Sequence, residues 1–242
     1  MKKRTVFILG ASSDIGVSIL KRYLDNDYEI VAHYNKGSKN FFDLVDQNPD
    51  IKKIKFNFST NLKNINNFLK NSVIKNCDVF INAAAVLKDI KYEKFSIQDL
   101  HETLKVNLFP GVMLTKLLGE KMFKNKWGRI VHLSSIGSKF GGGQSTFCYS
   151  LSKFGLEFFP NKIKIWAGKD VLVNTVRVGL TDTKLHKNIK ARKTNFGMKK
   201  RIKRVPLNRM ATTDEISKLV YNLGSEENTY ITGEVITIAG GE

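Results

Sequence analysis

The apolar run Thr5–Leu9 leads directly into the turn Gly10-Ala11-Ser12-Ser13-Asp14-Ile15-Gly16. Apolar residues at helical spacing follow in the segment Val17–Leu24. A second apolar run, Glu29–His33, then completes a strand–helix–strand unit. Units of this kind build parallel sheets, because the helix carries the chain back to the edge where the first strand began.

The glycine turn also predicts a ligand. A strand, a glycine turn and a helix in this order direct the N–H groups of the helix N-terminus at a phosphate. Gly10 allows the tight turn, and Gly16 allows the helix to pack closely on the strand. A glycine turn without a ligand is the alternative interpretation of this segment.

The residues after the second strand bear on the type of cofactor. A carboxylate here would accept hydrogen bonds from the ribose hydroxyls of NAD. The segment 33–39 reads His-Tyr-Asn-Lys-Gly-Ser-Lys and contains none. Its basic and polar side chains could hold a 2′-phosphate instead, so we expect NADP(H) rather than NAD(H). A solvated lysine loop is the alternative.

Strands and helices alternate along the rest of the chain. Apolar runs predict strands at 51–58, 79–81, 129–133, 172–176 and 231–239, and helical patterns cover 41–45, 62–74 and 97–124. With no repeats or linkers, this predicts one α/β domain over residues 1–242, a doubly wound, mostly parallel Rossmann-type sheet between two helical layers. Ligands of such sheets bind beyond the carboxyl ends of the strands. Gly10, Asn82, Ser135 and Gly179 all fall at such ends.

Two prolines interrupt helical segments. Pro110 lies in the helical pattern 97–124, where the missing N–H should kink the helix and free backbone groups near Asn107 for a water. Pro160 lies two turns beyond Lys153 and should kink or end that helix as well.

Tyr149 and Lys153 are four residues apart and should share one face of a helix. A free tyrosine has a pKa near 10, and a neighbouring cation favours the phenolate, which moves that pKa toward neutrality. The pair is therefore a candidate for proton transfer. Alone, this spacing is also common on exposed helix faces.

The cysteines and the apolar runs indicate whether the chain binds a metal and where in the cell it is found. Cys77 and Cys148 have no metal-ligand spacing, so we expect reduced thiols and no metal site. No apolar run approaches the roughly 20 residues of a membrane span. The basic start Met1–Arg4 leads into a run too short for a signal peptide, so we expect a cytoplasmic protein.

The chain resembles the short-chain dehydrogenase/reductase family over essentially its whole length. The matching segments, in order, are Gly10–Gly16, Asn82-Ala83-Ala84, Asn107, Ser135, Tyr149–Lys153, Val173-Asn174 and Tyr230–Gly241. The resemblance implies a ketoreductase: an NAD(P)-dependent oxidoreductase that reduces a ketone to a secondary alcohol, or the reverse, by hydride transfer.

The resemblance also implies roles for individual side chains. Tyr149 would be the general acid or base, and Lys153 would lower its pKa and bond the nicotinamide ribose. Ser135 would donate to the substrate oxygen, although the spacing to Tyr149 leaves Ser134 as an alternative. Asn107 would hold a water that links Lys153 to solvent.

The expected cofactor contacts come from the ends of successive strands. They are Gly10, Ser12, Ser13, Asp14, Ile15, Gly16, Tyr34, Asn35, Lys36, Asn57, Phe58, Asn82, Ala83, Ala84, Tyr149, Lys153, Val178, Gly179, Thr181 and Thr183. Three of them depart from the family pattern: Asp14 and Ala84 replace glycines, and Val178 replaces a proline. The carboxylate of Asp14 should point away from a pyrophosphate.

The net charge of +18 is concentrated most strongly where the family carries its substrate lid, at about 183–210. The basic residues of the segment are Lys184, Lys187, Lys190, Arg192, Lys193, Lys199, Lys200, Arg201, Lys203, Arg204 and Arg209. Such a lid could attract an anionic substrate, and Arg129 and Lys169 could extend the surface toward an acidic carrier protein. A solvated loop is the alternative.

Several functions remain open on the sequence alone. Within the enzyme class they are a 3-oxoacyl-carrier-protein reductase and a reductase of carbohydrate or cell-envelope biosynthesis. A non-catalytic NADP-binding regulator is the alternative from another class. The family resemblance implies a homo-oligomer, a dimer or tetramer, while the absence of a recognition motif argues against nucleic acid as a partner.

Overall fold

The computed structural model describes residues 3–242; Met1 and Lys2, part of the basic start, lie outside the described residues. Seven parallel strands form one sheet in the order β3-β2-β1-β4-β5-β6-β7. They are β1 Thr5–Leu9, β2 Glu29–Tyr34, β3 Lys52–Lys55, β4 Val79–Asn82, β5 Gly128–Ser135, β6 Val171–Val178 and β7 Val235–Ile238. The predicted doubly wound sheet is confirmed.

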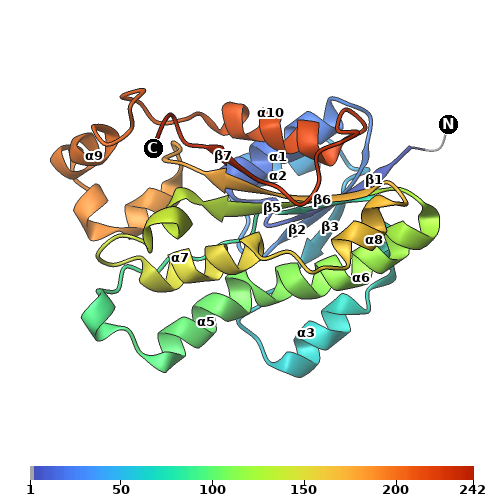
Figure 1. The fold of residues 1–242 in the computed structure, drawn as a ribbon, viewed down its shortest axis with the longest axis horizontal. Helices are drawn as coiled ribbons and strands as arrows, with labels where there is room; N and C mark the ends of the chain where they lie inside the picture. Colours follow the sequence, from blue (N-terminus) through green and yellow to red (C-terminus); the bar gives the residue numbers. More distant parts are fainter. Residues whose placement is uncertain (1–2) are drawn as a thin grey trace.

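Helices cover both faces of the sheet (Figure 1). One layer contains α1 (Asp14–Leu24), α2 (Lys39–Asp46) and α10 (Thr213–Gly224). The other contains α3 (Leu62–Leu69), α4 (Ser72–Lys75), α5 (Ile97–Asn107), α6 (Phe109–Asn125), α7 (Phe147–Phe154) and α8 (Ile163–Ala167). The lid helix α9 (Asn195–Ile202) lies beyond one end of the sheet (Figure 1).

Strand β1 shows why the apolar runs are continuous. Val6 and Ile8 pack under the α1 layer, whereas Phe7 and Leu9 pack under the α6 layer, and all four are fully buried. A strand with helices on both faces needs apolar side chains at every position.

Three predicted elements differ in extent. The strand at 51–58 is limited to β3, and the strand at 231–239 is limited to β7. The helix predicted at 62–74 is two helices, because the Asn71 side chain accepts from Val73 N and starts α4. Helix α10 was not predicted, although the Thr212–Glu215 capping box marks its start.

Neither proline lies inside a continuous helix. Helix α5 ends at Asn107, and α6 begins with Pro110 in its first turn, where a missing N–H costs nothing. Helix α7 ends at Phe154, a 3₁₀ turn follows to Glu157, and Pro160 lies beyond both. Pro160 therefore follows the end of the helix rather than kinking it.

Within residues 3–242, none of the helices combines the length and the apolar content that a bilayer crossing requires.

Candidate functional site

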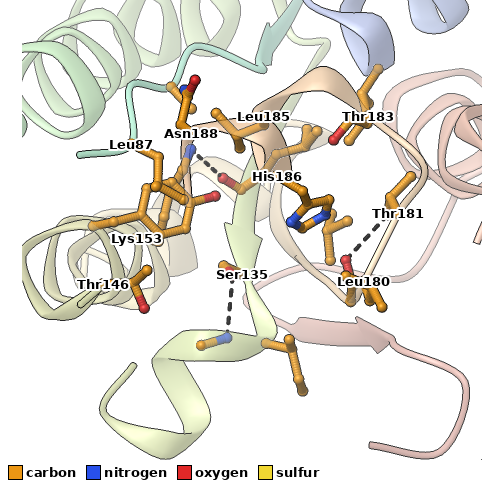
Figure 2. Close-up of a pocket in the computed structure, with 18 of the residues that line it drawn as sticks. Leu87, Ser135, Thr146, Lys153, Leu180, Thr181, Thr183, Leu185, His186 and Asn188 are labelled. Carbon is orange, nitrogen blue, oxygen red and sulfur yellow. Dashed lines mark hydrogen bonds between the residues drawn. The ribbon is translucent and has the colours of Figure 1, made fainter. Parts of the chain in front are cut away.

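A cavity of about 730 Å³ opens at the carboxyl end of the sheet. The turn residues Ser12–Ile15 line it on one side, and the lid residues Thr183–His186 line it on another. Figure 2 shows Ser135, Lys153 and His186 arranged around it. Residues from the glycine turn, β5, α7 and the lid therefore meet in one place.

The glycine turn has the close packing that its sequence predicts. Gly10 has a φ of 82°, and a Cβ there would lie 2.7 Å from Ala84 Cα. A Cβ on Gly16 would lie 2.3 Å from the Gly10 oxygen. Ser13 caps α1 by accepting from Gly16 N at 3.0 Å. The first turn of α1 consequently faces the cavity, where its free N–H groups suit a phosphate.

The carboxylate of Asp14 is engaged with the lid. Its Oδ2 accepts from Lys184 N at 2.6 Å. Asp14 therefore joins the glycine turn to the first residues of the lid.

The loop after β2 is tied to the glycine turn. Ser12 Oγ donates to the Lys36 oxygen at 3.0 Å, and Ser38 Oγ donates to the Ser12 oxygen at 3.1 Å. Lys36 and Ser38 both line the cavity. Ser38 is absent from the predicted contacts, although its position as the cap of α2 could have indicated it.

Several predicted cofactor side chains do not face the cavity. Phe58 is 3% exposed and packs in the core against Phe68. Tyr34 packs against Phe41, and the Asn35 side chain donates to Asn57. These side chains follow strand ends in sequence, but successive side chains in extended backbone point in opposite directions.

Asn82 and Ala84 serve the site through other contacts. Asn82 Nδ2 lies 3.2 Å from His132 Nδ1, within the buried layer under the cavity. The Ala84 carbonyl accepts from Lys153 Nζ at 3.0 Å. Ala83, between them, does line the cavity.

Helix α7 presents Tyr149 and Lys153 to the cavity one turn apart. Lys153 is 2% exposed, and its Nζ donates to the carbonyls of Ala84 and of Leu133, the latter at 2.9 Å. The amine thereby bridges the carboxyl ends of β4 and β5.

Burial controls the titration of both residues. It raises the pKa of Tyr149 to about 12, against the opposing effects of the Ser135 hydroxyl and of the Arg192 charge. It lowers the pKa of Lys153 to about 7. The expected lowering of the Tyr149 pKa by Lys153 is thus absent here. An amine with a pKa near 7 is only half protonated at neutral pH, and this one is directed at two carbonyls.

The two adjacent serines have different surroundings. The Ser135 hydroxyl accepts from Gly137 N at 3.2 Å, and its effect is to lower the pKa of Tyr149. Ser134 instead donates to Glu157 at 2.5 Å, which in turn pairs with Arg177. Ser134 is thus engaged away from Tyr149, whereas the Ser135 hydroxyl acts on the pKa of Tyr149, and this favours Ser135 over Ser134.

Asn107 holds α7 in place and does not line the cavity. Its Oδ1 accepts from Val86 N at 2.7 Å, and its Nδ2 donates to the Val86 oxygen at 3.0 Å and to Ser152 Oγ at 2.9 Å. Ser152 Oγ donates to the Tyr149 carbonyl. The side chain therefore positions the helix that carries Tyr149.

Two carboxylates, one accepting from a lid N–H and one pairing with a lid arginine, hold the lid over the cavity. Asp89 Oδ2 accepts from Lys190 N at 2.9 Å, and Arg201 pairs with Glu242 at 2.5 Å. Leu185, His186 and Glu242 line the cavity and were not predicted individually, because no local pattern marks a loop residue that tertiary packing brings to the site.

The suggested carrier surface at Arg129 is wrong. Arg129 is 1% exposed, and its guanidinium donates to the carbonyls of Ser225, Asn228 and Asp170. It stabilises the end of the sheet opposite the cavity.

Comparisons with known proteins agree with this arrangement. A family model described as enoyl-(acyl carrier protein) reductase matches residues 10–242. The 3-oxoacyl-[acyl-carrier-protein] reductase of Buchnera aphidicola subsp. Schizaphis graminum is 30% identical over 251 residues, covering 100% of this chain and 98% of the relative. The acetoacetyl-CoA reductase of Cupriavidus necator is 28% identical over 251 residues, with the same coverage.

Among solved structures, one from Beutenbergia cavernae superposes with a TM-score of 0.88 at 24% identity. The superposition covers 98% of this chain and 96% of that one. That protein is described as an NAD(P)-dependent gluconate 5-dehydrogenase with bound NADP. At this level of identity, the match shows the shared fold.

Proposed function

The chain belongs to the short-chain dehydrogenase/reductase family of NAD(P)-dependent oxidoreductases, and on that premise we propose that it reduces a ketone to a secondary alcohol with NADPH. The observation that carries the proposal is the convergence of Tyr149, Ser135 and Lys153 on one cavity that extends to the glycine turn. Loss of turnover in Tyr149→Phe, which removes only the hydroxyl, tests the proposal.

Each of these side chains has a task that its surroundings support. NADPH, when bound, supplies the hydride. Tyr149, whose raised pKa keeps it protonated at neutral pH, donates a proton to the carbonyl oxygen. Ser135 donates a hydrogen bond to the same oxygen, where negative charge develops. Lys153 orients the ribose of the cofactor, and Asn107 keeps α7 in position.

The two serines provide a matched pair of variants. Ser135→Ala should lower kcat by roughly 10²–10³-fold, the effect of removing one donor to a developing oxyanion. Ser134→Ala removes a hydroxyl that faces Glu157 instead, so kcat should change little. Steady-state rates of both variants at saturating NADPH measure this. A larger loss in Ser134→Ala would reverse the assignment.

Preference for NADP(H) rests on Lys36 and Ser38, which line the cavity beside the glycine turn. A bound NADP in the Beutenbergia cavernae protein supports it. Lys36→Glu replaces a cation with an anion where a 2′-phosphate would lie. The KM for NADPH should rise by roughly ten- to a hundredfold, whereas the KM for NADH should not rise. An equal change in both would show that Lys36 does not read the phosphate.

Two substrate classes remain candidates. The carrier-bound and coenzyme-A-bound substrates in the names of the relatives favour a 3-oxoacyl thioester. The gluconate dehydrogenase among the structural neighbours favours a sugar acid. NADPH oxidation with acetoacetyl-CoA and with 5-ketogluconate, measured side by side, separates the two by the ratio of kcat/KM.

A homo-oligomer is supported by an exposed apolar surface on adjacent helices. Val112 and Met113 of α6 are 49% and 42% exposed, and Leu151 and Phe154 of α7 are 38% and 55% exposed. Leu108, the residue before α6, lies next to Gly155, the residue after α7. We define these four exposed residues as the α6–α7 face, and its occupant is a second copy of this chain.

Charge introduced into the α6–α7 face should separate the subunits. Phe154→Lys would bury an ammonium in the interface, so the mass measured by light scattering should fall to that of one chain. Leu62→Lys changes an equally apolar residue, 67% exposed on α3, and should leave the mass unchanged. Monomeric wild-type protein would contradict the proposal.

A further inference from the structure

The lid side of the cavity gathers positive charge close to the reacting hydroxyl. Arg192 and Arg201 line it from within, and the exposed Arg204 lines its mouth. Arg192 and Tyr149 line the same cavity, and the charge of Arg192 lowers the pKa of Tyr149. A group held by Arg192 would therefore lie near a carbonyl that Tyr149 protonates.

Counter-ions for these guanidinium groups are scarce. Within the described residues, the carboxylates that line the cavity are Asp14 and Glu242. Asp14 accepts from Lys184 N, and Glu242 pairs with Arg201. Arg192 makes no ion pair within residues 3–242. Burial, and then the charge of Arg201, lowers the pKa of Arg192. An anion between the arginines would relieve this repulsion.

Arg192 is held in place by a neutral histidine. Its Nη1 donates to His186 Nδ1 at 2.9 Å, and a guanidinium can only donate, so the ring nitrogen must accept. Burial, with the charge of Arg192, lowers the pKa of His186 to about 4, so the ring stays uncharged at neutral pH. Such an arrangement orients the guanidinium without neutralising it.

Arg201 supplies a buried donor without a partner among the described residues. Its Nη2 pairs with Glu242, but its Nη1 is buried without a hydrogen-bond partner among residues 3–242. The side chain is only 12% exposed. A buried donor without a partner costs free energy unless a ligand satisfies it.

We infer that Arg192, with Arg201 and Arg204, binds an anionic group, a carboxylate or phosphate, that the substrate carries close to its ketone. This inference rests on the proposed ketone reduction and narrows its substrate class. A neutral 3-oxoacyl chain has no charge near the ketone, because the phosphates of its carrier lie at the far end of the pantetheine arm.

Matched substrates test the inference. Levulinate is compared with methyl levulinate, and dihydroxyacetone phosphate with dihydroxyacetone, by NADPH oxidation. We expect kcat/KM to favour the charged member of one pair by roughly ten- to a hundredfold, the effect of a hydrogen-bonded charge pair. A preference in the levulinate pair would identify the bound group as a carboxylate, and a preference in the dihydroxyacetone pair would identify it as a phosphate. Equal rates within both pairs, or faster reduction of the neutral members, would overturn the inference.

Variants of the lid show which residue causes the preference for the charged substrate. Arg192→Gln should bring the ratio of kcat/KM between the charged and the neutral member down to about one, because only the charged member loses a contact, whatever the variant does to the rate common to both. Arg192→Lys should restore part of the preference. Lys187→Gln, an exposed lid residue that does not line the cavity, is the control. Equal loss for both members in Arg192→Gln would mean that Arg192 only supports the lid, and would contradict the inference.

A binding measurement separates this inference from the proposed function. Calorimetric titration of levulinate and of dihydroxyacetone phosphate into the NADP⁺-saturated enzyme needs no turnover. Binding that Arg192→Gln abolishes supports the anion site even if no ketone is reduced, in which case only the proposed function fails. Turnover of the neutral thioester S-acetoacetyl-N-acetylcysteamine without binding of either anion would leave the function standing and overturn the anion site.

Discussion

Replacing Tyr149 with phenylalanine should lower kcat for ketone reduction by roughly 10²–10⁴-fold, the contribution that a positioned general acid makes. The phenol is the proton donor at the cavity, and its pKa of about 12 keeps it protonated through the neutral range. Phenylalanine keeps the ring and its packing, so NADPH affinity should stay within about twofold because only the hydroxyl is lost. Stopped-flow reduction and NADPH fluorescence titration measure the two quantities.

Tyr230→Phe is the matched control for this prediction. Tyr230 is 94% exposed, and it lies outside the cavity. The control should retain wild-type kcat. Comparable rates in Tyr149→Phe and in the wild type would end the assignment of Tyr149, and with it the proposed function.

Replacing Lys153 with methionine should lower kcat by roughly 10²-fold or more, because Lys153 orients the cofactor ribose for the same step in which Tyr149 gives up its proton. Groups that act together are strongly non-additive. The double variant Tyr149→Phe/Lys153→Met should therefore be little worse than either single variant. Independent, multiplying losses would show that Lys153 serves the reaction by a separate route.

Lys153→Met should also change how the free energy of unfolding depends on pH. The pKa of Lys153 is about 7 in the folded protein, below the 10.5 of a free lysine. Between these values the unfolded chain binds a proton that the folded chain lacks, so this residue makes stability rise with pH, by up to about 1.4 kcal/mol per pH unit. The free-energy cost of burying this lysine is largest below pH 7, where both states are protonated. It vanishes above about pH 10.5, where both states are neutral.

Lys153→Met should remove this slope. Urea unfolding at pH 7 and pH 9.5 measures it, with the cofactor absent in both cases. The wild type should gain more stability between the two pH values than the variant does. Equal gains would mean that Lys153 remains charged in the folded protein.

The α/β architecture followed from local patterns that packing cannot override. Continuous apolar strands such as Thr5–Leu9 must be covered on both faces, and the turn at Gly10 admits only glycine, with a φ of 82° and Ala84 Cα within contact of a Cβ. Pro110 lies in the first turn of α6, because proline has no N–H for a helix interior, and the helix that carries Lys153 has ended before Pro160 is reached. The pairing of Tyr149 with Lys153 on one helix face followed from the same kind of local periodicity.

Tertiary structure alone decided how these residues act. The chain order could not show that Lys153 points at the carbonyls of β4 and β5, nor that burial moves its pKa away from that of an exposed lysine. The order of residues also could not show which of Ser134 and Ser135 faces the substrate oxygen, or that Arg129 is buried at the edge of the sheet. Nor could it single out Arg192 from the eleven basic residues of the lid. Spacing in sequence defines local backbone geometry, whereas desolvation and charge depend on neighbours that only the folded chain brings together.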